Sequence, residues 1–307
     1  MNRLFLEKLL GKRIAQLKIK KQGNLFKNRS QIFCYQIIYA DGSRDVLYSK
    51  QGNIQDIRKT YQIMMALQKG FIDQKRVTPQ PLFLDSRKSL LIYRAILGRF
   101  LLGVIAKEEK PIIDPEHTLN LVASFLWRFH QFRYLPRLPK FNFINFQKEL
   151  IKMKKKVNQK FPERKDLLEK RFREVSQFFK TISNQKHFRL VHGDFNPSNI
   201  ILTNEDKVGV IDFSDSMLFH PGFDLGSFLG VVDFLEADRK LPARWIRKWT
   251  RGFVESYFKL NREQFEYSMF RQWNALKNIF VVIGLGERIP HNLKLAEEMV
   301  EIMERAR

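Results

Sequence analysis

LVHGDFNPSN at residues 190–199 and VIDF at residues 210–213 are the most informative stretches of this chain. They place a His, an Asp and an Asn at H-x-D-x-x-x-x-N spacing, and a second Asp follows the Asn after thirteen residues. A carboxylate such as that of Asp194 can accept a proton from a reacting hydroxyl. The amide oxygen of Asn199 and the carboxylate of Asp212 suit Mg2+, which keeps waters and phosphates as its other ligands. These residues therefore predict a proton acceptor next to a divalent cation.

The residues that join the two stretches are typical of a β-hairpin. Residues 200–202 are apolar and suit a short buried strand, residues 203–207 suit a turn, and residues 208–211 suit the return strand. A hairpin of that length would bring Asp212 back beside Asn199. One such pair of polar residues is common in any polar loop, but the complete set between two apolar strands is much less frequent by chance.

Residues 192–224 resemble the aminoglycoside phosphotransferase and choline kinase family, whose members have the protein-kinase-like fold. The resemblance rests on the His-Gly-Asp triplet, the form found in small-molecule kinases, and on HPGFDLG at residues 220–226. It implies that ATP is the phosphoryl donor, that Asp194 is the catalytic base, and that Asn199 and Asp212 bind Mg2+.

The same resemblance implies roles for three more residues. Asp224, with His192 as further structural support, would brace the catalytic loop from the start of a helix. A plain helix N-cap is the other interpretation of Asp224, and the two can hold together. Ser198 would lie close to the nucleotide phosphates.

The N-terminal part of the chain is typical of a small β-rich lobe. Alternating apolar residues and turn signals predict a helix at 54–69 and strands at 14–20, 31–39 and 45–50. In the family the third strand carries the lysine that pairs with the α- and β-phosphates. The resemblance therefore implies this role for Lys50.

The chain is expected to divide at residues 94–99, which would form a hinge between a lobe at 1–93 and a lobe at 100–307. Family members hold adenine at the hinge through backbone groups. Ile92 and Ile96 are expected to be apolar walls for the ring.

The N-terminal region departs from the family in two places. The loop at residues 21–30 has no G-x-G-x-x-G, so Gly23 and Asn24 are placed only loosely over the phosphates. The helix after the third strand offers no Glu to pair with Lys50, and the positions that align best are Thr60, Tyr61 and Gln62. Gln62 could orient Lys50 through a neutral hydrogen bond, and the ion-pair partner of the lysine stays open.

The remainder of the chain is mostly helical by its apolar period of 3.6 residues. A helix at 118–132 would end near His130, which we interpret as structural. Further helices are expected at 224–236, 243–258, 262 to about 283, and 292–307. The family forms its acceptor cleft in this region, and candidates without a motif are Asp215, Asp233, Glu236 and Trp273.

Residues 131–190 have the strongest charge bias, with 17 Lys and Arg against 5 Asp and Glu, which is +12 of the chain's +23. Two amphipathic helices are expected there. One interpretation is a solvated basic face on a packed helical hairpin. The other is a docking surface for an anionic partner: a phosphorylated substrate, lipid headgroups or RNA. No RNA-binding motif supports the last of these, so nucleic acid is not an expected partner.

The composition argues against a membrane-spanning or disulfide-stabilised protein. A chain of 307 residues with 44% hydrophobic residues and 28 Phe can pack two lobes. The single cysteine, Cys34, excludes an intramolecular disulfide and suggests a reducing, cytoplasmic location. No apolar run has the length of a membrane span. The basic residues 1–13 are expected to form a helix and not a targeting peptide.

Together these observations predict a two-lobed α+β protein-kinase-like fold, with a small antiparallel sheet and one helix in the first lobe and a larger, mainly helical second lobe. The resemblance implies ATP- and Mg2+-dependent transfer of a phosphoryl group to a hydroxyl of a small molecule. A net charge of +23 would repel polycationic aminoglycosides unless the cleft were locally acidic, so a sugar, an amino alcohol or a membrane-associated glycolipid is at least as suitable an acceptor. The alternatives are a catalytically weak nucleotide-binding protein, or a kinase relative that acts on an anionic, lipid-linked or RNA-associated partner.

Overall fold

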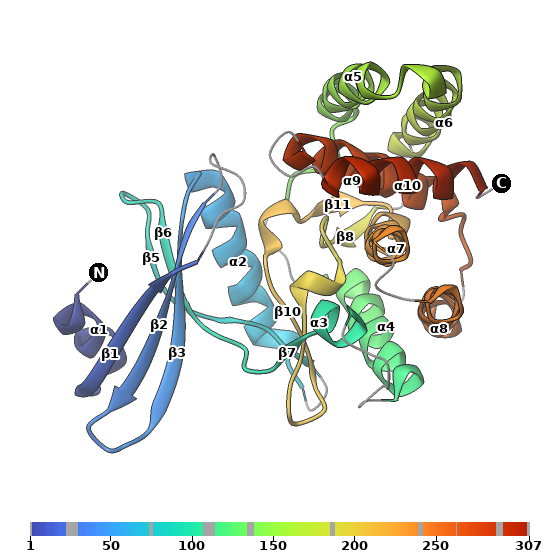
Figure 1. Cartoon of the computed structure of the whole chain (residues 1–307). Helices are drawn as coiled ribbons and strands as arrows, with labels where there is room; N and C mark the ends of the chain where they lie inside the picture. The colour runs from blue at the N-terminus through green and yellow to red at the C-terminus, as the bar shows by residue number, and fades with distance from the viewer. Residues whose placement is uncertain are drawn as a thin grey trace. The chain divides into compact units, whose positions relative to one another are not determined.

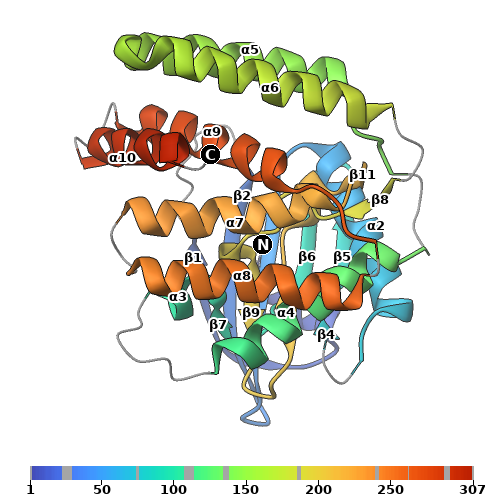
Figure 2. The same cartoon turned by 90° about the vertical axis from the view of Figure 1, so that its right-hand side faces the viewer.

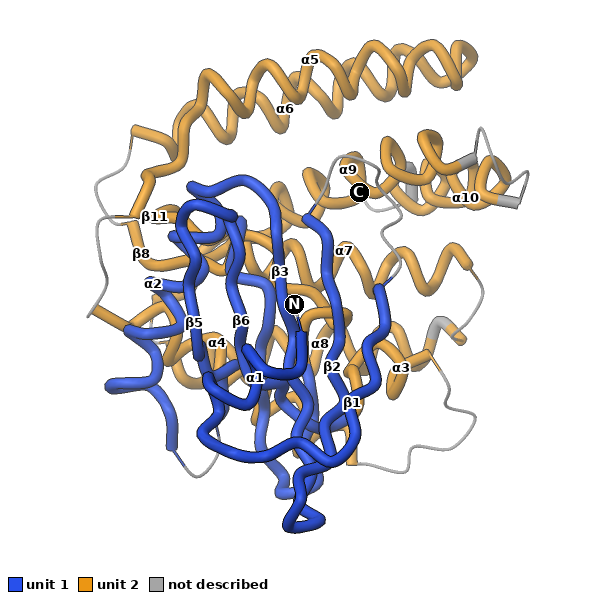
Figure 3. Tube along the Cα trace, turned by 90° about the vertical axis from the view of Figure 1, so that its left-hand side faces the viewer, with its two compact units in different colours: residues 1–98, 134–137, 201–215 blue, residues 99–133, 138–200, 216–307 orange. Residues whose placement is uncertain are grey.

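The computed structural model describes residues 2–22, 30–73, 76–106, 114–133, 138–184, 188–238, 242–261, 263–286 and 291–305. It has the predicted mixed α+β fold, with an antiparallel sheet in the N-terminal region and helices in the C-terminal region (Figure 1). The chain forms two compact units (Figure 3). Unit 1 contains the described residues up to Gly98 and also residues 201–215, and unit 2 contains most of the rest. The lobe boundaries at 93 and 100 stay a prediction.

Unit 1 is built on an antiparallel sheet of five strands in the order β1-β2-β3-β6-β5. The strands are β1 (Ile14–Lys21), β2 (Gln31–Tyr39), β3 (Arg44–Gln51), β5 (Gln80–Asp85) and β6 (Leu90–Arg94). The three strands predicted at the start of the chain are present within a residue or so. Lys50 of the central strand β3 pairs with Ile32 of β2 and Leu91 of β6. Gly23 and Asn24, which we placed over the phosphates, lie outside the described residues.

Two helices cover opposite faces of this sheet, α1 (Arg3–Leu10) and α2 (Ile54–Gly70) (Figure 1). Helix α1 is shorter than the predicted 1–13 because Gly11, at φ +66°, ends it in the left-handed conformation. Leu6 of α1 joins a buried core with Leu47 of β3. Successive side chains of a strand point to opposite faces, so Lys50 points away from this core.

A second small sheet completes unit 1. In it β10 (Val208–Val210) lies between β4 (Arg76–Val77) and β9 (Ile200–Leu202). The predicted hairpin is therefore present, and the Thr203 N–H closes its turn by donating to the Lys207 carbonyl at 2.9 Å. A 3₁₀ turn, η3 (Phe213–Asp215), follows and packs against α2.

Unit 2 is mainly helical and begins at β7 (Arg99–Phe100). Its helices are α3 (Leu101–Ala106), α4 (Pro115–Gln131), α5 (Phe143–Lys160), α6 (Lys165–Ser183), α7 (Gly222–Ala237), α8 (Ala243–Leu260), α9 (Ser268–Gly286) and α10 (His291–Arg305). Figure 2 shows the hairpin of α5 and α6 resting on α9, and α7 lying between α9 and α8. A ladder of two short strands, β8 (Arg189–Val191) and β11 (Met217–Phe219), precedes α7.

One predicted boundary is wrong: the helix expected from residue 262 begins at Ser268. The Glu266 carboxylate accepts a hydrogen bond from the Ser268 N–H, which the helix itself leaves without a partner at its first turn. The core of unit 2 is rich in phenylalanine, and Phe146 and Phe179 stack at 4.3 Å within it. None of the described helices is long and apolar enough to cross a membrane.

Candidate active site

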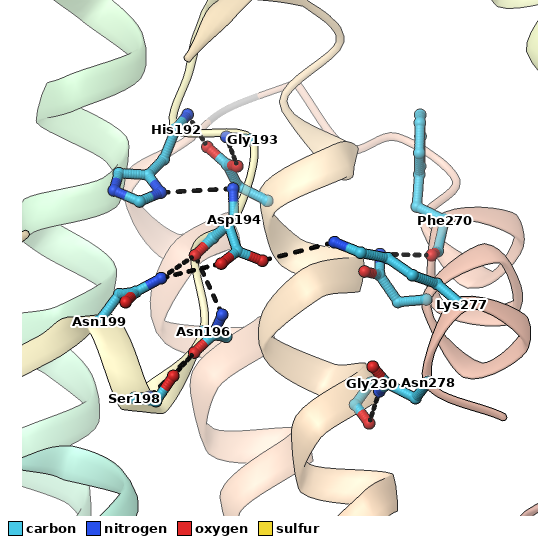
Figure 4. Close-up of polar contacts among 12 residues, drawn as sticks. His192, Gly193, Asp194, Asn196, Ser198, Asn199, Gly230, Phe270, Lys277 and Asn278 are labelled. Carbon is cyan, nitrogen blue, oxygen red and sulfur yellow. Dashed lines mark hydrogen bonds and ion pairs between the residues drawn. The ribbon is translucent and has the colours of Figure 1, made fainter. Parts of the chain in front are cut away.

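The predicted catalytic loop follows strand β8 and is bound through its backbone to a buried carboxylate. The N–H groups of His192 and Gly193 donate to Asp224 at 2.7 and 2.9 Å (Figure 4). Gly193 has φ +83°, a conformation that glycine adopts without the steric cost paid by other residues. The loop therefore turns sharply at Gly193 and exposes Asp194 just after the turn.

Asp224 belongs to a buried network that joins helices α4, α7 and α8. Its carboxylate lies 3.0 Å from His130 Nε2, and the His130 Nδ1 lies 2.7 Å from the Tyr257 hydroxyl. Burial raises the pKa of Tyr257, so its hydroxyl stays protonated. The Asp224 carboxylate accepts a hydrogen bond from the Nε2–H of His130. Three donors thus offset the cost of burying this carboxylate.

Sequence reasoning named Asp224 and His192 as supports and His130 as structural, but it missed Tyr257. No local pattern marks Tyr257, because its partner His130 is 127 residues away. His192 is itself fully buried, and its Nδ1 accepts the N–H of Asp194 at 3.3 Å. His192 therefore shapes the loop from inside the protein.

Asp194 is partly exposed, and Asn199 fixes its orientation. The Asn199 Nδ2 donates to the Asp194 carboxylate at 3.0 Å and to the Asp194 carbonyl at 2.9 Å. The amide oxygen of Asn199 faces away from Asp194, where it can serve as a ligand (Figure 4). Asn196 closes the short 3₁₀ turn η2 (Pro197–Asn199) by accepting the N–H and the hydroxyl of Ser198. Ser198 is exposed on the loop.

Lys277 is a second residue that sequence reasoning missed. It extends from α9 toward Asp194, and its Nζ lies 3.5 Å from the Asp194 Oδ1 (Figure 4). The available signal was weak: Lys277 is the one charged residue between Arg271 and Glu287, in a segment of mostly apolar residues.

Lys50 is buried in unit 1, and its partner is Asp212. The Lys50 Nζ lies 2.7 Å from the Asp212 Oδ1, and the Ser214 hydroxyl donates to the same oxygen at 2.7 Å. The interaction suggested for Gln62 is not found: Gln62 is exposed, and no hydrogen bond joins it to Lys50 within the part of the chain that is described. The hydroxyl of Thr60 is buried and has no hydrogen-bond partner there.

Asp212 is held in a conformation that is rare for residues with a side chain, with φ +64°. Strain of this kind concentrates at functional sites. Asp212 belongs to unit 1 and Asn199 to unit 2. A carboxylate and an amide oxygen are hard donors, and Mg2+ needs only one or two such protein ligands beside water and phosphate. The chemistry of the pair therefore fits the implied metal.

The two residues expected at the adenine ring are placed differently. Ile92 is fully buried in the core shared with α1, on the face of the sheet opposite Lys50, so it offers no surface to a ring. Ile96 is partly buried beside Gly209 and Val77, and it lines a cavity of about 440 Å³ in unit 1. Its contact with the base stays a prediction.

Two of the residues expected in the acceptor cleft form contacts within the protein instead. Asp233 forms a two-pronged ion pair with Arg271, with one contact at 2.8 Å, and this pairing raises the pKa of Arg271. Trp273 is buried in the core, 4.7 Å from the ring of Phe146. Asp215 lies in unit 1, and Glu236 is partly exposed on α7.

A cavity of about 660 Å³ opens in unit 2 next to the catalytic loop. Its polar lining consists of Asn196 and Ser198 from the loop and Asn278 from α9. The apolar lining comes from three elements: Phe100, Leu102, Gly103, Ala106, Val231, Phe234 and Leu235.

Comparison with known proteins identifies the family and the fold. The sequence profile of the phosphotransferase enzyme family matches residues 47–267. No curated protein matches the chain in sequence. The structure of APH(2")-IIia with GDP and kanamycin has 18% identity and a TM-score of 0.61 over 99% of this chain and 98% of that one. Spectinomycin phosphotransferase APH(9)-Ia, with ADP and spectinomycin, has 17% identity and a TM-score of 0.63 over 98% and 94%. These structures confirm the predicted protein-kinase-like fold.

Proposed function

The chain belongs to the phosphotransferase enzyme family, and from this premise we propose that it transfers the γ-phosphoryl group of ATP to a hydroxyl of a small molecule. The acceptor oxygen bonds to the γ-phosphorus while the bond from that phosphorus to the bridging oxygen breaks. ADP leaves with that electron pair, and the hydroxyl proton passes to the Asp194 carboxylate. The products are a phosphate ester, ADP and a proton.

One observation carries this proposal: the partly exposed carboxylate of Asp194 is held by hydrogen bonds on a loop whose residues Asn196 and Ser198 line a cavity. Asn199 holds its carboxylate at 3.0 Å, and Asp224 holds the backbone before it at 2.7 and 2.9 Å. A general base must be positioned to within hydrogen-bonding reach of its proton, and rigid support supplies that accuracy. A loop that served structure alone would not need its carboxylate exposed.

Binding of the nucleotide follows from the other predicted residues. We assign Asn199 and Asp212 to Mg2+, Lys50 to the α- and β-phosphates, and Ser198 to the phosphates from the loop side. When bound, the metal neutralises charge on the phosphate oxygens. The ion pair between Lys50 and Asp212 keeps the lysine extended toward the metal ligand. Structures of the same fold that contain GDP or ADP support this assignment.

The test is ADP release with Mg2+ and ATP across sugars, amino alcohols, sugar phosphates and aminoglycosides, with Asp212→Ala as the blank. Asp194→Asn should lower acceptor-dependent kcat by about 10²- to 10⁴-fold, the usual worth of a general base. The amide has nearly the same shape, so the melting temperature should change little. Asp166→Asn, an exposed carboxylate on α6, is the matched control and should keep full activity.

Two results would contradict the proposal. One is an Asp194→Asn variant that releases ADP as fast as the wild type. The other is a wild type that binds Mg2+ and ATP yet shows no turnover with any acceptor, which would favour the catalytically weak nucleotide-binding protein.

A further inference from the structure

The ammonium of Lys277 forms an ion pair with the Asp194 carboxylate at 3.5 Å. The 3.5 Å separation is longer than the 2.7–2.9 Å of a strong charge-assisted hydrogen bond. The two side chains are 34% and 31% exposed. The ammonium therefore retains hydrogen-bonding capacity and remains reachable from solvent at the place where an acceptor hydroxyl has to lie.

The cavity next to the catalytic loop, which Asn278 lines one residue after Lys277, is unsuited to a polycation. None of the described residues that line it is Asp or Glu, and seven of the ten are apolar. Both of its amide side chains already form hydrogen bonds within the protein: Asn278 donates to the Gly230 carbonyl at 2.9 Å, and Asn196 accepts from Ser198. An acceptor with several ammonium groups would meet Lys277 and find no carboxylate in this wall to offset the repulsion.

An acceptor with the opposite character would satisfy both features. A carboxylate or phosphate group would pair with Lys277 and draw it away from Asp194, which leaves that carboxylate to take the hydroxyl proton. An apolar portion would cover the wall formed by Val231, Phe234 and Leu235.

We propose, resting on the function given above, that the acceptor is an anionic hydroxyl compound with an apolar portion, and that Lys277 binds its anionic group. Lys277 is thus a residue that determines substrate class, from a position in the sequence 83 residues away from Asp194.

The first experiment measures binding without turnover. Thermal stability of the nucleotide-free protein is followed with benzoate, phenyl phosphate, benzyl alcohol and benzylamine. At least one of the two anions should raise the melting temperature of the wild type. Comparing the increase caused by benzoate with that caused by phenyl phosphate shows whether the site prefers a carboxylate or a phosphate. The effect should vanish in Lys277→Gln, persist in Lys277→Arg, and be unchanged in Lys259→Gln, an exposed lysine of α8. Stabilisation by benzylamine and by neither anion would overturn the proposal.

The second experiment measures ADP release with phenyl glucoside, phenyl glucuronide, glucose 6-phosphate and kanamycin. Lys277→Gln should raise KM at least tenfold for the anionic acceptors, while KM for the neutral glucoside and for ATP stays within about twofold. An equal loss for neutral and anionic acceptors, or a preference for kanamycin, would contradict the proposal. Anion binding through Lys277 without any ADP release would refute the proposed function and leave the anion site standing.

Discussion

At the scale of single residues, His220 shows how burial sets a charge state in unit 2. The ring stacks on Phe270 at 5.1 Å, and its Nδ1 accepts the N–H of Gly222 at 3.1 Å, which requires an unprotonated nitrogen. Burial lowers the pKa of His220 to about 4, and the nearby His130 contributes in the same direction. Both observations describe a neutral imidazole near neutral pH.

This pKa predicts a loss of stability in weak acid. Between pH 6.5 and pH 4 the unfolded chain binds a proton at His220 and the folded chain does not, so the free energy of unfolding decreases as the pH falls. From pH 7 to pH 5 the decrease from this residue should be about 2 kcal/mol. Urea titrations at the two pH values would measure it, with His220→Asn as the comparison. Equal decreases in both proteins would show that His220 does not titrate in this way.

At the scale of elements, three glycines on one face of α7 let it pack closely against α9. Gly222, Gly226 and Gly230 are spaced four residues apart, which places them on the same side of the helix. A Cβ built on Gly226 would lie 2.4–2.6 Å from the backbone and Cβ of Phe270, and one on Gly230 would lie 2.7 Å from the Cβ of Asn274. This contact sets the position of α9, and with it the position of Lys277 beside the catalytic loop.

We expect Gly226→Ala to destabilise the protein by about 1–3 kcal/mol, because the added methyl would overlap the backbone of Phe270 and force α7 and α9 apart. It should also lower kcat/KM, since Lys277 and Asn278 move with α9. Gly284→Ala, in α9, is the control: among the described residues its Cβ would meet only the Lys156 Nζ at 3.6 Å, an ordinary contact. Chemical denaturation and ADP release would be measured for both variants. A Gly226→Ala protein as stable as the wild type would contradict the close-packing argument.

Helix α5 presents an unusual outward face. Its buried side chains, Phe146, Leu150, Met153 and Val157, face the protein. On the opposite side Ile144 and Ile151 are 65% and 61% exposed and lie seven residues apart. Three exposed lysines, Lys148, Lys152 and Lys155, lie on the same side. Apolar residues among lysines are typical of helices that lie on anionic membrane surfaces, and this pattern is less suited to RNA, where stacking aromatic residues are used.

The anionic partner of residues 131–190 is therefore predicted to be a lipid surface. Vesicles containing phosphatidylglycerol should bind the protein, and vesicles of phosphatidylcholine should not. At about 1 kcal/mol per lysine, replacing the three lysines by Gln should weaken binding by roughly a hundredfold. Replacing Ile144 and Ile151 by Ser should weaken it without changing its salt dependence. The prediction would be wrong if both variants bound the vesicles as tightly as the wild type, or if the protein bound RNA more tightly than the vesicles.

At the scale of the whole molecule, the two compact units have separate cores. Unit 1 packs one of its cores between the sheet and α1, and unit 2 packs a phenylalanine-rich core among its helices. The predicted functional residues are divided between them, with Lys50 and Asp212 in unit 1 and Asp194 and Asn199 in unit 2. The chain has a net charge of +23, which should favour the binding of anionic ligands, and more strongly at low salt.

The amino-acid sequence alone was enough to predict the fold class through the family resemblance of residues 192–224, and to predict the strand that carries Lys50 and the hairpin between Asn199 and Asp212. The strand and the hairpin could be predicted because their signals are local: turn residues between apolar runs, a period of two in strands and 3.6 in helices. The identity of the lysine's partner, the contact of His130 with Asp224 and Tyr257, and the presence of Lys277 were decided by tertiary packing. Those contacts join residues 162, 94, 127 and 83 positions apart. Periodicity within one element carries no information about which side chain a distant element will bring to it.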